Sequence, residues 1–212
     1  GANGTGTNYI STAEGVYVVY ENVCQLLDLD TGKTLREFRL PSDAEGQPAP
    51  WSYLNVVDDY LIAGSNALVS ETGDDGRPAI GKNDNLSASK RLYVLDRKTG
   101  DVRWQTEATN HFRHNAICAG GGRLFTVDLL SEGELDRLKR RGQEPTTSSA
   151  LRVFDLASGE TVWSNDDEVF GTWLSYSAGH DVLVEAGRPG LDLLPDEARG
   201  MRTYRAADGE VL

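Results

Sequence analysis

The sequence predicts an all-β fold built from four consecutive repeated units. Three observations predict it. The first two are that glycine is abundant, at 23 of 212 residues, and that one short motif returns four times along the chain. A third is that the apolar segments are short and separated by turn residues, with few long helical runs. Glycine accepts the positive φ that tight turns between strands require.

The repeated motif is an apolar residue, an acidic residue, a short turn and a glycine. It reads Leu-Asp-x-x-Thr-Gly at 27–32 and 95–100 and Phe-Asp-x-x-Ser-Gly at 154–159, and a worn copy occupies 204–209. Its recurring positions are Asp28, Gly32, Asp96, Gly100, Asp155, Gly159 and Gly209. Once a variable insertion in each unit is allowed for, the units recur about every 40 residues, which is typical of propeller blades.

Each unit has room for four short antiparallel strands, the composition of one blade. In the third unit the strands are expected at 115–119, 124–127, 151–154 and 160–164, with the motif turn between the outer two. The blades are placed at about residues 7–40, 51–108, 113–167 and 172–212, the last of them truncated. The fold class is therefore a β-propeller segment of about four four-stranded antiparallel blades.

A tryptophan follows the turn glycine by four residues in two units, as Trp104 and Trp163. A large flat ring at this place can pack between neighbouring blades, whereas a lone tryptophan could instead stack on a cofactor. Repetition at equivalent positions favours the packing interpretation. The first unit departs from the pattern, with Arg36 at this position.

The segments 95–104 and 154–163 resemble the repeat of the pyrroloquinoline-quinone (PQQ) enzymes. That repeat builds the quinoprotein alcohol dehydrogenases and the propeller lipoprotein of the outer-membrane assembly machine. Segments 112–117 and 170–174 are similar to PQQ-like propellers of planctomycete-type bacteria, and WD40 repeats share the period but not the motifs. The resemblance implies a parent propeller of seven or eight blades, of which this chain is an incomplete part, and an extracytoplasmic or periplasmic bacterial location.

Charge and cysteine content exclude several classes of function. With 21 basic and 33 acidic residues the net charge is -12, which repels phosphate backbones and anionic lipid, and no apolar run is long enough for membrane insertion. Nucleic acid and membrane are therefore not expected partners. Cys24 and Cys118 form no CxxC motif, so they predict no zinc site. Two separate thiols are favoured over one disulfide.

The insertions and the loops that lead into the innermost strands are expected on one face of the disc. The insertions span 65–90, 128–149 and 187–200, with short helices expected at 132–141 and 191–199. The loops that lead into innermost strands, which we call approach loops, contain Trp51, 111–115 and 170–173. Variable loops on a rigid scaffold are where binding residues concentrate, so this loop-rich face is the candidate site.

The candidate ligand-binding residues on this face are Trp51, His111, Arg113, His114, Asn115, Thr172 and Trp173. His111 and His114 could hold a metal, but His180 is expected on the opposite face and no third ligand is evident. Arg113 and His114 could instead grip an anion. The third interpretation is that His114 and Asn115 satisfy buried backbone groups.

The sequence carries no complete catalytic motif: a Gly-x-Ser-x-Gly elbow, a Walker A loop and HExxH are all missing. The family resemblance implies PQQ and Ca²⁺ as possible cofactors, but the vicinal Cys-Cys pair and a calcium motif are missing too, so no cofactor is expected. We expect a noncatalytic binding or scaffold module whose loop-rich face contacts a protein or a small ligand, and whose blades pack on the remaining blades of the same parent chain. The alternative is part of a larger enzyme, quinoprotein-like or fused to another catalytic domain.

Overall fold

The structure is a computed structural model that describes residues 9–20, 22–42, 46, 48–67, 88–130, 132–187 and 200–212. Its strands are β1 (Tyr9–Thr12), β2 (Gly15–Tyr20), β3 (Val23–Leu27), β4 (Thr34–Phe38), β5 (Trp51–Val57), β6 (Tyr60–Ala67), β7 (Ala88–Asp96), β8 (Val102–Gly120), β9 (Arg123–Asp128), β10 (Ala150–Asp155), β11 (Thr161–Asn165), β12 (Trp173–Ser177), β13 (Val182–Ala186) and β14 (Met201–Arg205). Most of the predicted insertions 65–90 and 187–200, and the helical turn expected at 191–199, lie outside the described residues.

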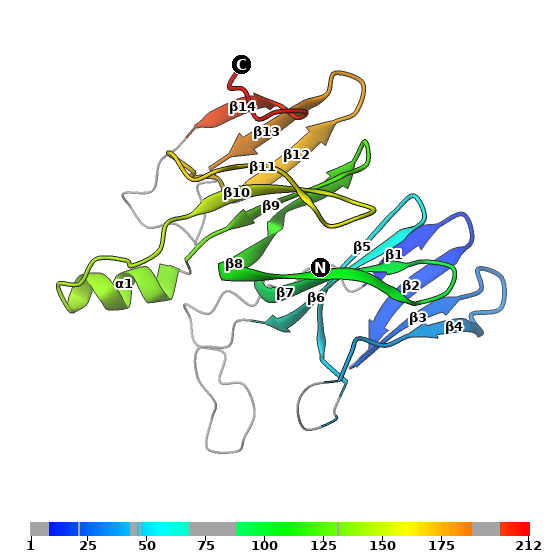
Figure 1. Ribbon diagram of the computed structural model, residues 1–212. Coiled ribbons are helices and arrows are strands. Elements are labelled where there is room, and N and C mark those ends of the chain that lie inside the picture. The colour runs from blue at the N-terminus through cyan, green and yellow to red at the C-terminus, as the bar shows by residue number, and fades with distance from the viewer. Residues whose placement is uncertain are drawn as a thin grey trace.

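The strands form three antiparallel sheets. One sheet contains β1–β4, a second runs from β5 to β11, and the third contains β12–β14. In Figure 1 the sheets follow one another along an arc, with β1–β4 at one end and β12–β14 at the other. Within the described chain no strand of the first sheet packs on a strand of the last sheet, so the arc is open.

The seven-stranded sheet is two blades joined by one long strand. The first half of β8 is the outer partner of β7, and its second half is the inner partner of β9. Phe112 pairs with Ser89 on one side and with Asp128 on the other, so the chain stays extended as it passes between blades. The strand predicted at 115–119 is therefore longer than expected, and a register shift between Phe112 and Ile117 marks the change of partner.

The one helix among the described elements, α1 (Glu132–Arg140), lies between β9 and β10, where a short helix was predicted. Basic residues fill its last turn, which is favourable beside the negative end of the helix dipole. No helix in the described ranges is long and apolar enough to cross a membrane.

A hydrophobic cluster lies between each pair of neighbouring blades. The first cluster contains Tyr17 and Leu61, the second Ile62 and Leu124, and the third Phe125 and Leu183, all fully buried. Both cysteines are free thiols, one buried and one half-buried, in agreement with the prediction of two separate thiols. Each blade thus buries both of its faces only when it has neighbours on both sides.

Neighbouring blades are also joined by a repeated contact that we call the clasp. A side-chain N–H from the outer strand of one blade donates to the backbone carbonyl that follows the motif's acidic position in the next blade. Trp104 Nε1 donates to the Leu156 oxygen, and Trp163 Nε1 to the Ala206 oxygen, both at 2.9 Å. Where the first blade lacks a tryptophan, Arg36 Nη1 makes the same bond to the next blade, at 2.9 Å. The arginine thus replaces the indole without loss of the interblade hydrogen bond.

The carbonyl that receives the clasp is itself held in place. The backbone N–H of the same residue donates to the inner hairpin of its own blade: Leu156 to the Gly122 oxygen and Ala206 to the Asp181 oxygen, each at 2.9 Å. Arg97, which accepts the bond from the first blade, donates in the same way to the Asp59 oxygen at 2.9 Å. The clasp therefore links an outer strand of one blade to the inner hairpin of the next.

The turn glycines are required for two separate reasons. Gly159 and Gly209 have φ of 77° and 79°, which side-chain-bearing residues rarely adopt. In addition, a Cβ at Gly159 would lie 2.6 Å from Cδ2 of Trp104, and one at Gly209 would lie 2.7 Å from Cε3 of Trp163. The glycine leaves the space that the indole of the preceding blade occupies. The sequence predicted only the first reason.

The acidic residue of the motif closes its own turn. Asp28 Oδ1 accepts from the Thr31 backbone N–H at 2.8 Å, and Asp155 Oδ1 accepts from the Ser158 backbone N–H at 2.8 Å. These bonds favour the charged carboxylate, so hydrogen bonding from Thr31 lowers the pKa of Asp28 and that from Ser158 lowers the pKa of Asp155. In the first three blades the turns lie between the outer two strands, whereas the fourth blade has three strands in the described chain and its turn follows β14.

Candidate functional site

The described part of the loop-rich face is centred on residues 108–114 and the segment 129–149 that carries α1. The sequence predicted a loop at 111–115, but the structure shows this stretch as a bulged part of β8, with a register shift on each side of Phe112. The name approach loop is kept for residues 108–114. Asn110 joins the two: its Nδ2 donates to the Ser148 oxygen at 2.9 Å, and its Oδ1 accepts from Thr147 Oγ1 at 2.5 Å. The Leu129 N–H also donates to the His111 oxygen at 2.9 Å. The insertion and the approach loop are therefore one hydrogen-bonded unit at the edge of the third blade.

A buried carboxylate fixes the backbone of this approach loop through hydrogen bonds. Asp128, the last residue of β9, is fully buried. Its two oxygens accept from the backbone N–H groups of Thr109 and Asn110, both at 2.7 Å. Arg152 lies on the same carboxylate, with 3.0 Å between Nη2 and Oδ2, and it compensates the buried charge.

A lysine holds the opposite side of the same loop. Lys90 Nζ donates to three successive carbonyl oxygens, those of Ala108 at 2.6 Å, Thr109 at 3.0 Å and Asn110 at 3.2 Å. Its position coincides with a register shift in the pairing of β7 with β8. The N–H groups of the loop thus face a carboxylate and its carbonyl groups face an ammonium, which fixes the backbone from both sides.

His114 belongs to a buried polar chain between the second and third blades. Its Nε2 lies 2.7 Å from Ser89 Oγ, which lies 2.7 Å from Ser52 Oγ, and its ring packs on Tyr53 at 5.2 Å between centroids. His114 is 4% exposed, and burial lowers its pKa to about 3, so the imidazole is neutral. Its Nδ1 has no hydrogen-bond partner among the described residues.

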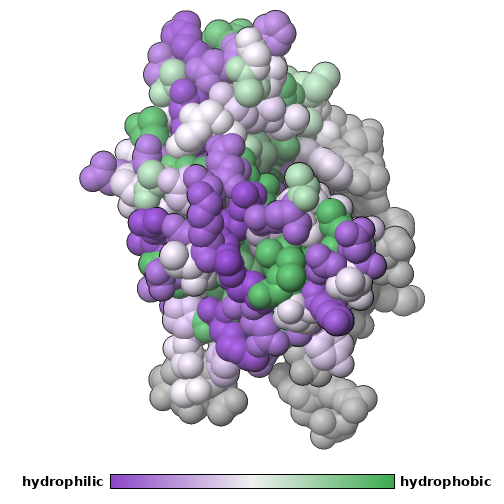
Figure 2. Space-filling model, turned by 90° about the vertical axis from the view of Figure 1, so that its right-hand side faces the viewer, coloured by the Kyte–Doolittle hydropathy of each residue, from purple (hydrophilic) through white to green (hydrophobic). Residues whose placement is uncertain are grey.

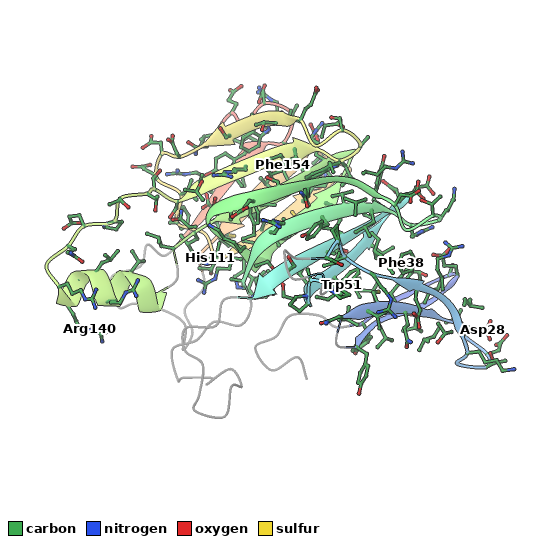
Figure 3. The ribbon with its side chains drawn as sticks, turned by 60° about the horizontal axis from the view of Figure 1, so that its bottom comes forward. Asp28, Phe38, Trp51, His111, Arg140 and Phe154 are labelled. Carbon is green, nitrogen blue, oxygen red and sulfur yellow. The ribbon has the colours of Figure 1, made fainter. Side chains whose placement is uncertain are left out.

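The remaining predicted residues fall into two groups. Trp51 begins β5 and is buried in the core between the first two blades, next in sequence to the Ser52 of the His114 chain. Figure 3 shows Trp51 and His111 at the same edge of the sheets, toward the side on which α1 lies. Of their neighbours, Arg113 is buried and Asn115 is exposed.

The other group lies on the fourth blade. Thr172 is buried, and its N–H donates to the Ala186 oxygen at 3.0 Å. Trp173 is 38% exposed and lines a hollow of about 390 Å³ on the outer face of β12–β14, with Met201 on the same wall. The structure therefore does not bring the predicted residues together at one site: Trp51 packs between the first two blades, His114 between the second and third, and Trp173 faces away from the preceding blade.

The histidines do not form a metal site in the described structure. His180 lies in the turn between β12 and β13, at the far end of β12 from Thr172. Among the residues that the structure describes, no three His, Cys, Asp or Glu side chains are grouped closely enough to hold a metal ion.

The residues that organise the face were not predicted from the sequence. Asp128, Lys90 and Asn110 belong to no motif, although an acidic residue at the end of an apolar strand is a signal that could have singled out Asp128. The fourth blade uses the same device: Glu185, fully buried, accepts from the N–H groups of Phe170 at 3.0 Å and Gly171 at 2.6 Å. Buried carboxylates thus fix two approach loops.

No family model and no curated protein matches the chain. Among solved structures, a europium-containing methanol dehydrogenase is similar over 96% of this chain and 40% of its own, at 11% identity and a TM-score of 0.58. The WD40 domain of Pan2 from Neurospora crassa is similar over 96% of this chain and 50% of its own, at 12% identity and a TM-score of 0.55. The quinohemoprotein alcohol dehydrogenase ADHIIG from Pseudomonas putida HK5 is similar over 98% of this chain and 33% of its own, at 13% identity and a TM-score of 0.54.

The fold is that of a β-propeller. At these identities the likeness shows the fold alone, and it includes both a quinoprotein and a WD40 propeller. It lends no support to the narrower resemblance to planctomycete-type proteins. The chain spans between a third and a half of the length of these structures.

Proposed function

We propose that the chain is a noncatalytic β-propeller binding module that uses its loop-rich face, residues 108–115 with the segment 129–149, to contact a protein or a small ligand. The observation that carries the proposal is the fixed approach loop. Asp128, Lys90 and Asn110 hold its backbone N–H groups, its carbonyl groups and the neighbouring insertion. A backbone segment held in one conformation loses little entropy when it binds, so this fixed, bulged part of β8 with its exposed side chains is suited to recognition.

The fixed conformation of the approach loop does not require a catalytic role for its residues. His114 is neutral and buried, and it is bonded to Ser89, which is itself fully buried. Asn115 and Thr109 present exposed side chains from the same loop region. These features support a surface that recognises a partner over one that carries out chemistry.

Site-specific photo-crosslinking tests the proposal. A photoreactive residue is placed at Asn115, on the loop-rich face, and in a matched variant at Ser158, an exposed residue in the motif turn between β10 and β11. In an extract of the source organism the variant at position 115 should form a defined adduct and the one at 158 should not. An adduct at 158 with none at 115, or equal adducts at both positions, would refute a partner surface on the loop-rich face.

The alternative, that the chain is part of a quinoprotein-like enzyme, rests on the fold likeness to a quinohemoprotein alcohol dehydrogenase. The described residues do not fit the cofactor pair well: they supply no cluster of metal ligands, and Trp51, a candidate for stacking on a quinone, is packed in a core. PQQ with Ca²⁺ is titrated into the protein and the quinone absorbance and dye reduction are followed. We expect no saturable change; a saturable quinone spectrum with dye reduction would establish the alternative.

A further inference from the structure

The arc of blades has two end faces that correspond to the two halves of its internal interfaces. We call the face of a blade that is turned toward the next blade in sequence its forward face, and the opposite face its backward face. Each internal interface joins the forward face of one blade to the backward face of the next. The forward face of β12–β14 and the backward face of β1–β4 are the two that no other described blade covers (Figure 1). They can be compared with the internal faces residue by residue, because the strand register is known.

The forward face of the last blade repeats an apolar surface that is buried elsewhere. Counted from the motif turn, Met201 is equivalent to Leu151 of the third blade, and Val184 to Phe125. Leu151 and Phe125 are fully buried against the fourth blade, whereas Met201 is 78% exposed. The hollow of about 390 Å³ beside Trp173 lies on this same face. The face has the composition of a blade interface but is open to solvent.

On the backward face of the first blade, no other described blade covers the residue whose carbonyl would accept a clasp hydrogen bond. Leu29 follows the motif acid as Leu156 and Ala206 do in the third and fourth blades; it is 54% exposed, whereas these two are 1% and 0% exposed. A Cβ built on Gly32 would meet no described atom within 4 Å, although the equivalent Gly159 is in contact with an indole. Tyr9 of β1, 62% exposed, extends the apolar area. Figure 2 views the side on which β1–β4 lie in Figure 1, and a hydrophobic patch framed by hydrophilic residues is visible there.

We propose that two copies of this chain associate head to tail, with the forward face of β12–β14 in one copy packed on the backward face of β1–β4 in the other. The interface continues the one that the chain already makes between its own blades, so both surfaces have the complementary shape and apolar character that it needs. Because the two faces differ, the contact is heterologous, and a second identical junction brings two arcs together into a ring. This inference does not depend on the binding role of the loop-rich face.

The net charge of the chain predicts how the association depends on salt concentration. Each copy has a net charge of -12, so two copies repel one another at low ionic strength. Salt screens that repulsion and strengthens apolar contacts. The association should therefore tighten as salt is raised, opposite to a contact held by ion pairs.

Sedimentation velocity over micromolar concentrations tests the proposal with one variant for each face. Met201→Asp alters the forward face and Leu29→Asp the backward face; both side chains are largely exposed, so the fold is retained, which circular dichroism verifies. Each variant should weaken association by a factor of about ten or more, because a carboxylate is placed in an apolar contact. Val162→Asp, at an exposed apolar position of β11 away from both faces, is the matched control and should associate like the unaltered chain.

Mixing the two variants distinguishes a head-to-tail contact from a symmetric one. Each variant retains one intact face, and the two intact faces are complementary, so the mixture should form a heterodimer through one junction. An unaltered chain that remains monomeric at all concentrations and salt levels would overturn the proposal. Loss of association in one variant alone, or a mixture that contains no heterodimer, would overturn it as well.

Discussion

Replacement of Gly159 by alanine should be far more costly than the same replacement of Gly32, although both glycines occupy the same position of the same turn. Their φ angles are similar, at 77° and 67°, so an alanine is strained to a similar extent at both places, by about 1–2 kcal/mol. The difference between them is the clasp. At Gly159 the new Cβ would lie 2.6 Å from Cδ2 of Trp104, whereas at Gly32 it meets no described atom within 4 Å.

The additional cost at Gly159 follows from displacement of the indole. Trp104 packs on Phe154 at 5.7 Å between ring centroids and donates its hydrogen bond to the Leu156 oxygen. Loss of that bond costs about 1 kcal/mol, and partial loss of packing costs a further 1–2 kcal/mol, roughly a third of a complete Trp→Ala truncation. We therefore expect Gly159→Ala to lower the free energy of unfolding by about 3–5 kcal/mol and Gly32→Ala by about 1–2 kcal/mol.

Urea unfolding followed by circular dichroism measures both variants, and a double-mutant cycle isolates the cause. In a Trp104→Ala background the clash no longer exists, so Gly159→Ala should cost only as much as Gly32→Ala does in the unaltered chain. Equal destabilisation by the two alanines, within about 0.5 kcal/mol, would refute the clasp as the reason for this glycine.

The remaining predictions concern buried polar groups. Asp128→Asn should lower the free energy of unfolding by about 3 kcal/mol, because it leaves Arg152 without its buried carboxylate, and urea unfolding measures it. The pKa of His114 in the folded chain, about 3, lies below the ordinary 6.5. As the pH falls, its imidazole therefore binds a proton in the unfolded chain before it does so in the folded chain. Stability should thus fall as pH drops from about 6.5 toward 3, by up to about 1.4 kcal/mol per pH unit, and His114→Gln should remove this part of the slope. Burial raises the thiol pKa of both Cys24 and Cys118 to about 12, so a thiol reagent at pH 8 should leave the fully buried Cys24 unlabelled until denaturant is added and label the half-buried Cys118 more slowly than a free thiol; rapid labelling of Cys24 would contradict its burial.

The periodic features of the fold could be predicted from the sequence because they are local. The motif turns at Asp28, Asp96 and Asp155 depend on residues within a few positions of one another, and the repetition of Trp104 and Trp163 indicated packing in place of ligand binding. Arg36 interrupted this pattern in the sequence. The structure shows that its guanidinium makes the interblade bond that an indole makes elsewhere.

The candidate site was less predictable because its geometry depends on residues far apart in sequence. Lys90 contacts carbonyl groups about 20 residues away, and Asp128 contacts amides at a similar separation. Neither residue forms a motif, so only the tertiary structure brings them together. His114 drew attention because of its proximity to His111, yet its contacts are Ser89 and Tyr53, on the strands of the preceding blade.

Exchange of the indole N–H protons with solvent tests the clasped arrangement of blades most directly. The chain has four tryptophans, and each indole contributes one N–H proton. The indoles of Trp104 and Trp163, bonded to the Leu156 and Ala206 oxygens, should exchange much more slowly in the folded chain than in the urea-unfolded chain. Trp104→Phe should remove one slow signal and leave that of Trp163 unchanged. Exchange at both Trp104 and Trp163 as fast as in the urea-unfolded chain would contradict the clasped arrangement of blades.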